Sequence, residues 1–205
     1  MSRESNTQYI IGYGSLLNHD SRLRFSNLNI QPIRVRLHGW QRCWHARSYP
    51  EQQTFVGVEQ AAGASLNGAL IPTQTLTPEL IERERDYQFI EIAPDALELQ
   101  PALNGKDTTA LANKTFWLCQ PNAPEWPDAD FPVYQSYVDT CLAGALESGN
   151  TEGAWQFIES TIGWEHNWVD DRLTPQYPRA AKLDKALIDQ IDLILAQSDL
   201  LNHRK

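Results

Sequence analysis

Apolar and polar side chains alternate through the stretch IRVRLHGWQRCW at residues 33–44. A period of two places one kind of side chain on each face of an extended chain, so this stretch predicts a half-buried strand, with a bend at Gly39. Shorter runs of similar character predict further strands at residues 8–13, 54–60, 65–72, 87–93 and 114–120. Several short strands with few helices between them predict a small mixed or mostly antiparallel barrel-like sheet.

Helical patterns are concentrated in the last third of the chain. The proline-rich segment PNAPEWPDADFP predicts a loop after the last of these strands, and three helices are expected beyond it. They span residues 132–148, 151–161 and 183–198, with SGNTEG separating the first two. The sequence therefore predicts one α+β domain over 1–205, with a sheet-rich core at 8–120 and a helical C-terminal extension at 132–205 on one side of the sheet.

Two short helices are expected inside the sheet-rich part. Asn18 is a suitable N-cap for a helix over 19–25, because its side-chain oxygen can accept a hydrogen bond from a first-turn amide. In TPELIERER, a cap at Thr77 begins a second helix, whose Leu80 and Ile81 are expected to point inward.

Charge and cysteine content narrow the range of partners. The net charge of −9 argues against nucleic acid or an anionic membrane as the main partner. No apolar run is long enough to cross a bilayer, and the N-terminal MSRESNTQ lacks the hydrophobic core of a signal peptide. Cys43, Cys119 and Cys141 show no CxxC spacing, which favours buried, reduced thiols. We expect a cytoplasmic protein with a small-molecule partner, and the sequence leaves its oligomeric state open.

The common signatures of metal, nucleophile and cofactor chemistry are not found in the sequence. The five histidines show no paired ligand spacing with one another or with the cysteines, so no metal is predicted. They are His19, His38, His45, His166 and His203. Ser15 in GYGSL is misplaced for a nucleophile elbow, the GxGxxG pattern is incomplete, and a P-loop lysine is missing.

A glycine-serine turn stands near the start of the chain, in YIIGYGSLLNHDSRLRF at residues 9–25. Glycine lets another group approach the backbone closely, and the first amides of a helix carry partial positive charge. The turn is therefore suited to hold a carboxylate or phosphate. A purely structural strand-to-helix turn is the alternative.

A second polar element is ERERDYQFIEI at residues 82–92, where a helix passes into a strand. It places Arg83, Glu84 and Tyr87 close together in sequence. The other charged residues there are expected to be solvated surface: Glu82, Arg85 and Asp86.

Taken together, these motifs resemble the γ-glutamylcyclotransferase-like family, in particular its bacterial members. The order GYGSLL, RLHGWQRCWHAR, NGALIP and RERDYQFIEI fits, and the resemblance covers roughly residues 8–120. The family's hallmark tetrapeptide is matched by Tyr13, Gly14, Ser15 and Leu16.

In the second family motif, the position of the catalytic glutamate is matched by Glu84, with Arg83 before it and Tyr87 after it. The chain departs from the family pattern at Ile81, where many relatives have aspartate, and at Asp86, where relatives often have glycine. The second departure lies in the turn that aims Glu84.

The resemblance implies an enzyme that converts a γ-glutamyl amide or peptide to 5-oxoproline and a free amine. The substrate's own α-amino group attacks its γ-carbonyl, so the reaction needs no enzymic nucleophile, metal or cofactor. Glu84 would be the general acid/base, and Tyr87 and the turn from Tyr13 to Leu16 would bind substrate. The resemblance leaves open which amine is released and whether glutathione is a substrate.

Two other functions are compatible with the same residues. One is a non-catalytic sensor that binds a γ-glutamyl metabolite, and the other is related amide chemistry on a different amino-acid conjugate. A scaffold that binds a protein through the acidic helical half is a third reading, without a specific motif behind it.

The segment GWEHNWVDDRLTPQYPRA at residues 163–180 is dense in functional side chains. A loop pinned by tryptophans and an Asp–Arg pair explains it in structural terms. The functional alternative is a wall over the Glu84 pocket, with Trp168 and Arg172 as the residues that face the substrate.

Overall fold

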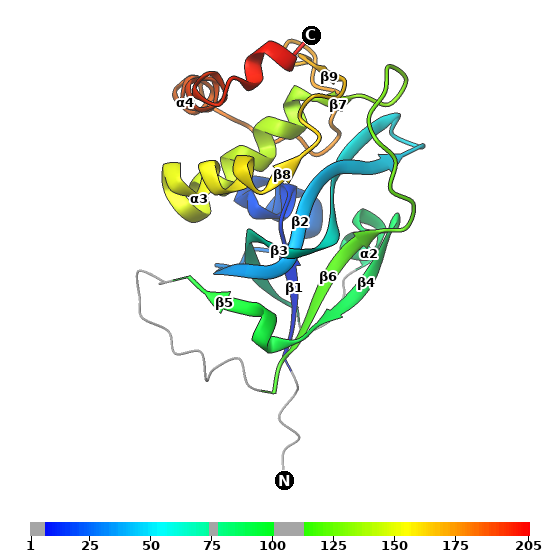
Figure 1. Cartoon of the computed structure of the whole chain (residues 1–205), viewed down its shortest axis with the longest axis vertical. Helices are drawn as coiled ribbons and strands as arrows, with labels where there is room; N and C mark the ends of the chain where they lie inside the picture. The colour runs from blue at the N-terminus through cyan, green and yellow to red at the C-terminus, as the bar shows by residue number, and fades with distance from the viewer. Residues whose placement is uncertain (1–6, 74–77, 101–112) are drawn as a thin grey trace.

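The computed structural model describes residues 7–73, 78–100 and 113–205. Within these ranges one mixed sheet has the strand order β4-β6-β1-β3-β2-β5, with β8 paired to β2, and a second small sheet joins β7 and β9. The strands are β1 Gln8–Gly12, β2 Ile33–Ser48, β3 Gln53–Thr73, β4 Tyr87–Ile92, β5 Leu97–Leu99, β6 Thr115–Pro121, β7 Val133–Tyr134, β8 Thr161–Ile162 and β9 Trp168–Val169. The predicted α+β class with a curled, barrel-like sheet is confirmed (Figure 1).

The described residues also form helices. They are η1 Ser15–Leu17, α1 His19–Ser26, α2 Pro78–Arg83, η2 Pro94–Ala96, α3 Gln135–Glu159, α4 Lys185–Gln197 and η4 Leu200–His203. In Figure 1, α3 and α4 lie together near the C-terminus. No helix in the described ranges is long and apolar enough to cross a membrane.

The long strands β2 and β3 form an antiparallel hairpin that bends as one ribbon. The predicted bend at Gly39 is present, with φ of +80° and a register shift between His38 and Trp40. The prediction of two strands at 54–60 and 65–72 is wrong, because β3 is continuous through both. Gly63, with φ of +81°, lies where the pairing with β2 is interrupted, since the register passes from Gln60 opposite Trp40 to Ser65 opposite His38. The strand bends at this bulge.

The turn between β1 and α1 is held from both sides. Asn18 caps α1 as predicted, since its side chain accepts a hydrogen bond from the Ser21 amide at 2.8 Å. The Arg22 guanidinium, buried beneath the turn, donates to the carbonyls of Leu16 at 2.7 Å and Leu17 at 2.5 Å. The turn therefore has a fixed shape before any ligand arrives.

The predicted break in the helical half is present. α3, Gln135–Glu159, consists of two helical segments that meet at a kink, where Asn150 has φ 54° and ψ −155°. This residue lies in the SGNTEG segment, which was expected to separate two helices, so that prediction is confirmed. Residues 133–134, predicted as helix, instead form β7.

One hydrophobic cluster joins the sheet to the helical part. Trp44 of β2 packs edge-on against Tyr137 of α3 and Trp164, at ring-centroid distances of 5.9 and 5.0 Å.

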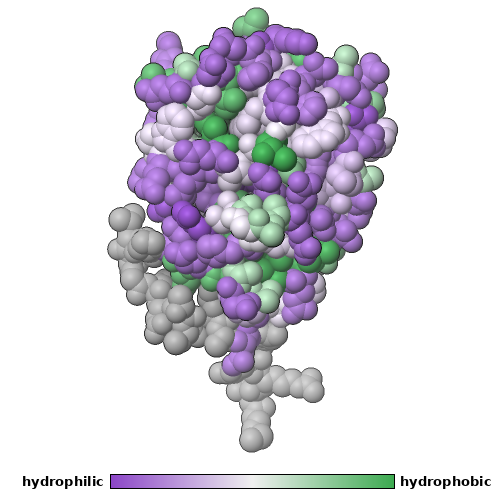
Figure 2. Space-filling model, viewed as in Figure 1, coloured by the Kyte–Doolittle hydropathy of each residue, from purple (hydrophilic) through white to green (hydrophobic). Residues whose placement is uncertain are grey.

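The three cysteines are buried and free, as predicted. On the face shown in Figure 2, hydrophobic residues form small separate patches among hydrophilic ones.

The short helix α2 differs from its prediction. Ile81 was expected to point inward and is 49% exposed. The face that α2 buries carries Arg83 instead, whose guanidinium donates to Ser26 Oγ of α1 at 2.8 Å. The expected cap Thr77 and the side chain of Leu80 lie outside the described residues.

Candidate active site

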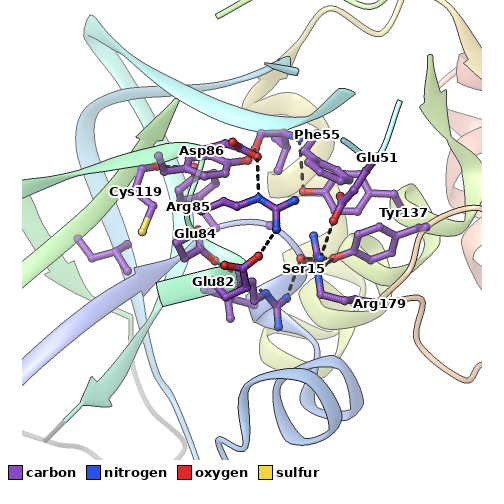
Figure 3. A pocket seen from close by; sticks show the side chains of 18 residues that line it. Ser15, Glu51, Phe55, Glu82, Glu84, Arg85, Asp86, Cys119, Tyr137 and Arg179 are labelled. Atoms are coloured by element: carbon purple, nitrogen blue, oxygen red, sulfur yellow. Dashed lines mark hydrogen bonds and ion pairs between the residues drawn. The ribbon is translucent and has the colours of Figure 1, made fainter. Parts of the chain in front are cut away.

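A pocket opens where the β1–α1 turn, the start of β3 and the α2–β4 junction meet (Figure 3). Residues from β6, from α3 and from the segment after β9 complete its wall. All six sequence-predicted binding and catalytic residues line it: Tyr13, Gly14, Ser15, Leu16, Glu84 and Tyr87. The structure therefore brings together two motifs that are about seventy positions apart in the sequence.

The glycine-serine turn contributes backbone to the pocket. At Gly14 a Cβ atom would lie 2.6 Å from Val56 Cγ1 and 3.2 Å from Tyr137 Oη, so only glycine fits. No acceptor in the described part of the chain takes the amide hydrogens of Ser15 and Leu16. These amides can therefore donate to an anionic ligand.

Arg83 connects the two motifs. Its guanidinium donates to Ser15 Oγ at 2.8 Å, and its Nε lies 3.8 Å from Glu84 Oε1. The side chain is only 3% exposed, so its charge acts at low dielectric. Arg83 thus fixes the serine turn and places a positive charge beside the carboxylate.

Glu84 is a buried carboxyl group, 8% exposed. Burial raises the pKa of Glu84 above its ordinary value of 4.5, because water no longer solvates the ionised form. The guanidinium groups of Arg83 and Arg179 oppose this rise. So does the Cys119 thiol, which donates a hydrogen bond to the carboxylate. A carboxyl group with a raised pKa can both take and return a proton near neutral pH.

Tyrosines surround the carboxylate. Tyr13 donates to the Cys119 carbonyl at 2.5 Å, and Tyr87 donates to the Val56 carbonyl at 3.3 Å. Burial raises the pKa of both phenols well above 10.0, so both are present as hydrogen-bond donors.

The segment after β9 supplies residues that sequence reasoning did not assign to the site. Tyr177 and Arg179 both line the pocket. Arg179 Nη1 pairs with Glu51 at 3.0 Å, and its Nε donates to Tyr177 Oη at 3.3 Å. Glu51 lies in the β2–β3 turn, and its Oε2 is buried without a hydrogen-bond partner among the described residues. Only the density of polar and aromatic side chains at 163–180 pointed to this part of the site.

An aromatic wall faces these polar groups. Phe55 and Tyr137 pack edge-on at a centroid distance of 4.9 Å, and Tyr137 and Tyr177 at 4.6 Å. This wall excludes water from one side of the pocket and holds Tyr177 in position.

The charged residues expected to be solvated surface form the rim of the same pocket. Arg85 pairs with Glu82 and lies 3.8 Å from Asp86, as Figure 3 shows. All three side chains are at least one-third exposed, so they are solvated and line the entrance as well.

The pocket-wall prediction for Trp168 and Arg172 is wrong. Trp168 is 2% exposed and packs on Trp164 at a centroid distance of 5.6 Å, inside the core. Arg172 donates to Asp139 at 2.7 Å and to Asp192 at 2.8 Å, which ties the loop to α3 and α4. Neither residue lines the pocket, because the segment turns toward it only from Tyr177 onward.

Comparisons with known proteins establish the fold. No protein-family model matches the sequence, and no curated protein matches it either. Among solved structures, a protein described as gamma-glutamyl cyclotransferase superposes with a TM-score of 0.56 at 16% identity, over 91% of this chain and 99% of that one. The chain thus has a γ-glutamylcyclotransferase-like fold, as predicted.

Two further solved structures share this architecture. The human uncharacterized protein loc79017 has a TM-score of 0.54 at 16% identity, over 91% of this chain and 99% of that one. YkqA from Bacillus subtilis has a TM-score of 0.51 at 18% identity, over 75% of this chain and 54% of YkqA. At these identities the likeness concerns the fold.

Proposed function

We propose that the protein is a γ-glutamylcyclotransferase-like enzyme that converts a γ-glutamyl amide to 5-oxoproline and a free amine. The observation that carries this proposal is the buried carboxyl group of Glu84 in one pocket with the unpaired turn amides at Ser15 and Leu16. The fold it shares with a protein described as gamma-glutamyl cyclotransferase supports the same reaction class.

The substrate's anionic groups meet a positive side of the pocket. The amides at Ser15 and Leu16 and the guanidinium of Arg83 can hold the α-carboxylate or the oxyanion that develops on the γ-carbonyl oxygen. Bending the substrate so that its α-nitrogen faces its γ-carbonyl replaces a bimolecular step by an intramolecular one.

The path of the proton follows from the position of Glu84. The α-ammonium gives one proton to the Glu84 carboxylate, and its nitrogen then forms a bond to the γ-carbonyl carbon. The bond from that carbon to the leaving nitrogen breaks, and Glu84 returns the proton to this nitrogen. The new ring nitrogen passes its surplus proton along the same path, so the amine leaves as an ammonium ion. Atoms balance without any group beyond the substrate and this carboxyl group.

The opposite side of the pocket suits a polar leaving amine. Arg179 and Glu51 present both charges there, and Glu51 Oε2 has no partner among the described residues. Amino-acid and peptide amines fit such a pair better than a purely aliphatic amine does.

The test is 5-oxoproline release from a panel of γ-glutamyl amino acids, glutathione and γ-glutamyl-amines. Glu84→Gln should lower kcat by about 10²–10⁴ on the accepted substrate, because the proton carrier is lost. Glu82→Gln is the matched control, since this neighbouring carboxylate is 69% exposed at the rim, and its activity should stay near wild type.

Calorimetry with the same panel separates the rival functions. A folded wild-type protein that binds a γ-glutamyl compound and releases no 5-oxoproline would be a sensor. Equal activity of wild type and Glu84→Gln would remove Glu84 from its proposed role.

A further inference from the structure

Three side chains that can bind a metal ion lie together on the β2–β3 hairpin, outside the Glu84 pocket. The Cys43 thiol, one ring nitrogen of His45 and one carboxylate oxygen of Glu59 lie within 4.8 Å of one another. None of the three lines the pocket.

Strand pairing explains why the sequence did not predict this cluster. Cys43 is paired with Gly57, and Glu59 lies two residues further along β3, on the same face of the ladder. His45 is two residues beyond Cys43, within the register shift between Trp44 and Ala46, which turns its side chain relative to a regular strand. Spacing along the chain shows only Cys-x-His, and the third donor comes from the partner strand.

His45 packs against the Trp126 ring at a centroid distance of 5.9 Å, and one of its ring nitrogens is available to a ligand. It is 3% exposed, and its Nδ1 is buried without a hydrogen-bond partner among the described residues. A buried polar atom without a partner loses its hydration and gains nothing in return, so a native structure usually gives it one.

The other two donors complete a chemically coherent set. The Cys43 side chain is in hydrogen-bond contact with Glu59. Glu59 is exposed, so a cation has a path from solvent to the buried pair. A metal ion would displace the thiol proton to solvent as the metal–sulfur bond forms.

We propose that Cys43, His45 and Glu59 bind one divalent cation of borderline softness, Zn²⁺ in the first place, with a water molecule or exogenous ligand in the fourth position. Sulfur, nitrogen and oxygen donors in one site suit Zn²⁺ and disfavour Mg²⁺ and Ca²⁺, which take oxygen ligands. With metal–ligand distances of about 2.0–2.3 Å, tetrahedral ligands lie about 3.3–3.8 Å apart. The donors therefore need to close by on the order of 1 Å, which the exposed Glu59 side chain can supply by rotation.

This site revises the sequence prediction of no metal and does not depend on the proposed reaction. Bound Zn²⁺ would cross-link β2 to β3, on the strands that carry the β2–β3 turn with Glu51 into the pocket. Its expected effect is on stability, because a ligand that binds only the folded state raises the unfolding temperature.

The test uses the full chain, stripped with a chelator and titrated with Co²⁺. Wild type should bind one equivalent, show a thiolate-to-cobalt charge-transfer band in the near ultraviolet, and lose it when Zn²⁺ is added. Zn²⁺ alone should raise the unfolding temperature of wild type. In Cys43→Ser the charge-transfer band should vanish, and Glu59→Gln should bind Co²⁺ at least about tenfold more weakly.

Glu59→Gln is the decisive variant, because its exposed side chain can be replaced without disturbing the core. His38→Gln is the matched control. His38 lies on the same strand as Cys43, is exposed, and pairs with Glu98 of β5 at 3.1 Å. This variant should bind Co²⁺ like wild type. A wild-type protein without the charge-transfer band, or a folded Glu59→Gln that binds as tightly as wild type, would overturn the site.

Discussion

The hydroxyl group of Tyr177 donates a hydrogen bond to Ser15 Oγ at 2.9 Å, across 162 positions of sequence. The bond ties the segment after β9 to the glycine-serine turn, beside the Arg83 guanidinium that contacts the same oxygen. The helical half of the chain therefore supplies part of the pocket as well as part of the core.

We expect Tyr177→Phe to weaken substrate binding and leave the fold intact. The phenyl ring keeps its packing on Tyr137 and Phe55, while the turn at Ser15 loses one of its two side-chain partners. A hydrogen bond of this kind contributes about 1 kcal/mol, which corresponds to a roughly fivefold rise in KM. Steady-state kinetics and thermal unfolding check this.

The control for this variant is Tyr49→Phe, which removes an exposed tyrosine's bond to Glu125 at 2.6 Å, away from the site. Equal kinetics for wild type, Tyr177→Phe and Tyr49→Phe would show that the Tyr177 bond has no part in substrate binding.

Glu84 is expected to cost stability at neutral pH. Its pKa is raised in the folded state, so its contribution to stability is fully present below 4.5. As the pH rises, the unfolded chain ionises first, and stability is lost until the pH passes the folded pKa. A pKa that is higher by one in the folded than in the unfolded chain corresponds to about 1.4 kcal/mol. Glu84→Gln cannot ionise, so it should gain stability over wild type at pH 7 and lose that gain at pH 4.

Thermal unfolding of both proteins at the two pH values measures this difference. Glu82→Gln, at an exposed carboxylate two residues earlier in the chain, is the reference variant measured under the same conditions. A gain for Glu84→Gln that is larger at pH 4 than at pH 7 would mean that Arg83 and Arg179 stabilise the ionised carboxylate more than burial penalises it.

Local sequence patterns predicted much of the fold because they reflect local physics. The alternation at 33–44 and the cap at Asn18 depend on neighbours in the chain, and both are present. The sequence did not predict that β3 continues through Gly63, because a glycine in the sequence is compatible both with a turn and with a bend inside a strand. The exposure of Ile81 was not predicted, because α2 buries the guanidinium of Arg83 in place of an apolar side chain.

Predictions for the site failed where tertiary structure decides. Glu84 and the glycine-serine turn were found through a resemblance of short motifs, and they share a pocket. The segment at 163–180 was expected to contribute to the site, but its tryptophans, Trp164 and Trp168, lie in the core, and its pocket residues are Tyr177 and Arg179. No local pattern distinguishes an arginine that ties helices together from one that faces a ligand.

Gly14→Ala should impair activity more than stability. The added Cβ would meet Val56 Cγ1 at 2.6 Å and Tyr137 Oη at 3.2 Å, so the turn that carries the free amides must shift. Overpacking of this kind costs about 1–3 kcal/mol, and a shift of the turn misplaces the amides for the substrate. We expect a fall in kcat/KM of at least about tenfold.

Gly149→Ala is the matched control for this substitution. Its Cβ would approach only the flexible end of Arg34, at 3.2 Å from Nη2, and it would meet no atom of the glycine-serine turn within 4 Å. It should keep wild-type kinetics, and wild-type kinetics in Gly14→Ala as well would show that the turn tolerates a side chain.

Arg172→Met should destabilise the protein without changing its chemistry. Asp139 is buried, with a side chain only 6% exposed, and accepts two hydrogen bonds from Arg172 at 2.7 and 2.8 Å. Burial already raises the pKa of Asp139, and Arg172 is the main opposing influence. Removing one partner of a buried pair costs about 3–5 kcal/mol, because the other charge is left without compensation.

Chemical denaturation should show this loss. The double variant Arg172→Met, Asp139→Asn should recover part of it, since no charge is then left unpaired. At a temperature where the single variant is folded, its substrate preference should match wild type. A change in preference with unchanged stability would place Arg172 in the site after all.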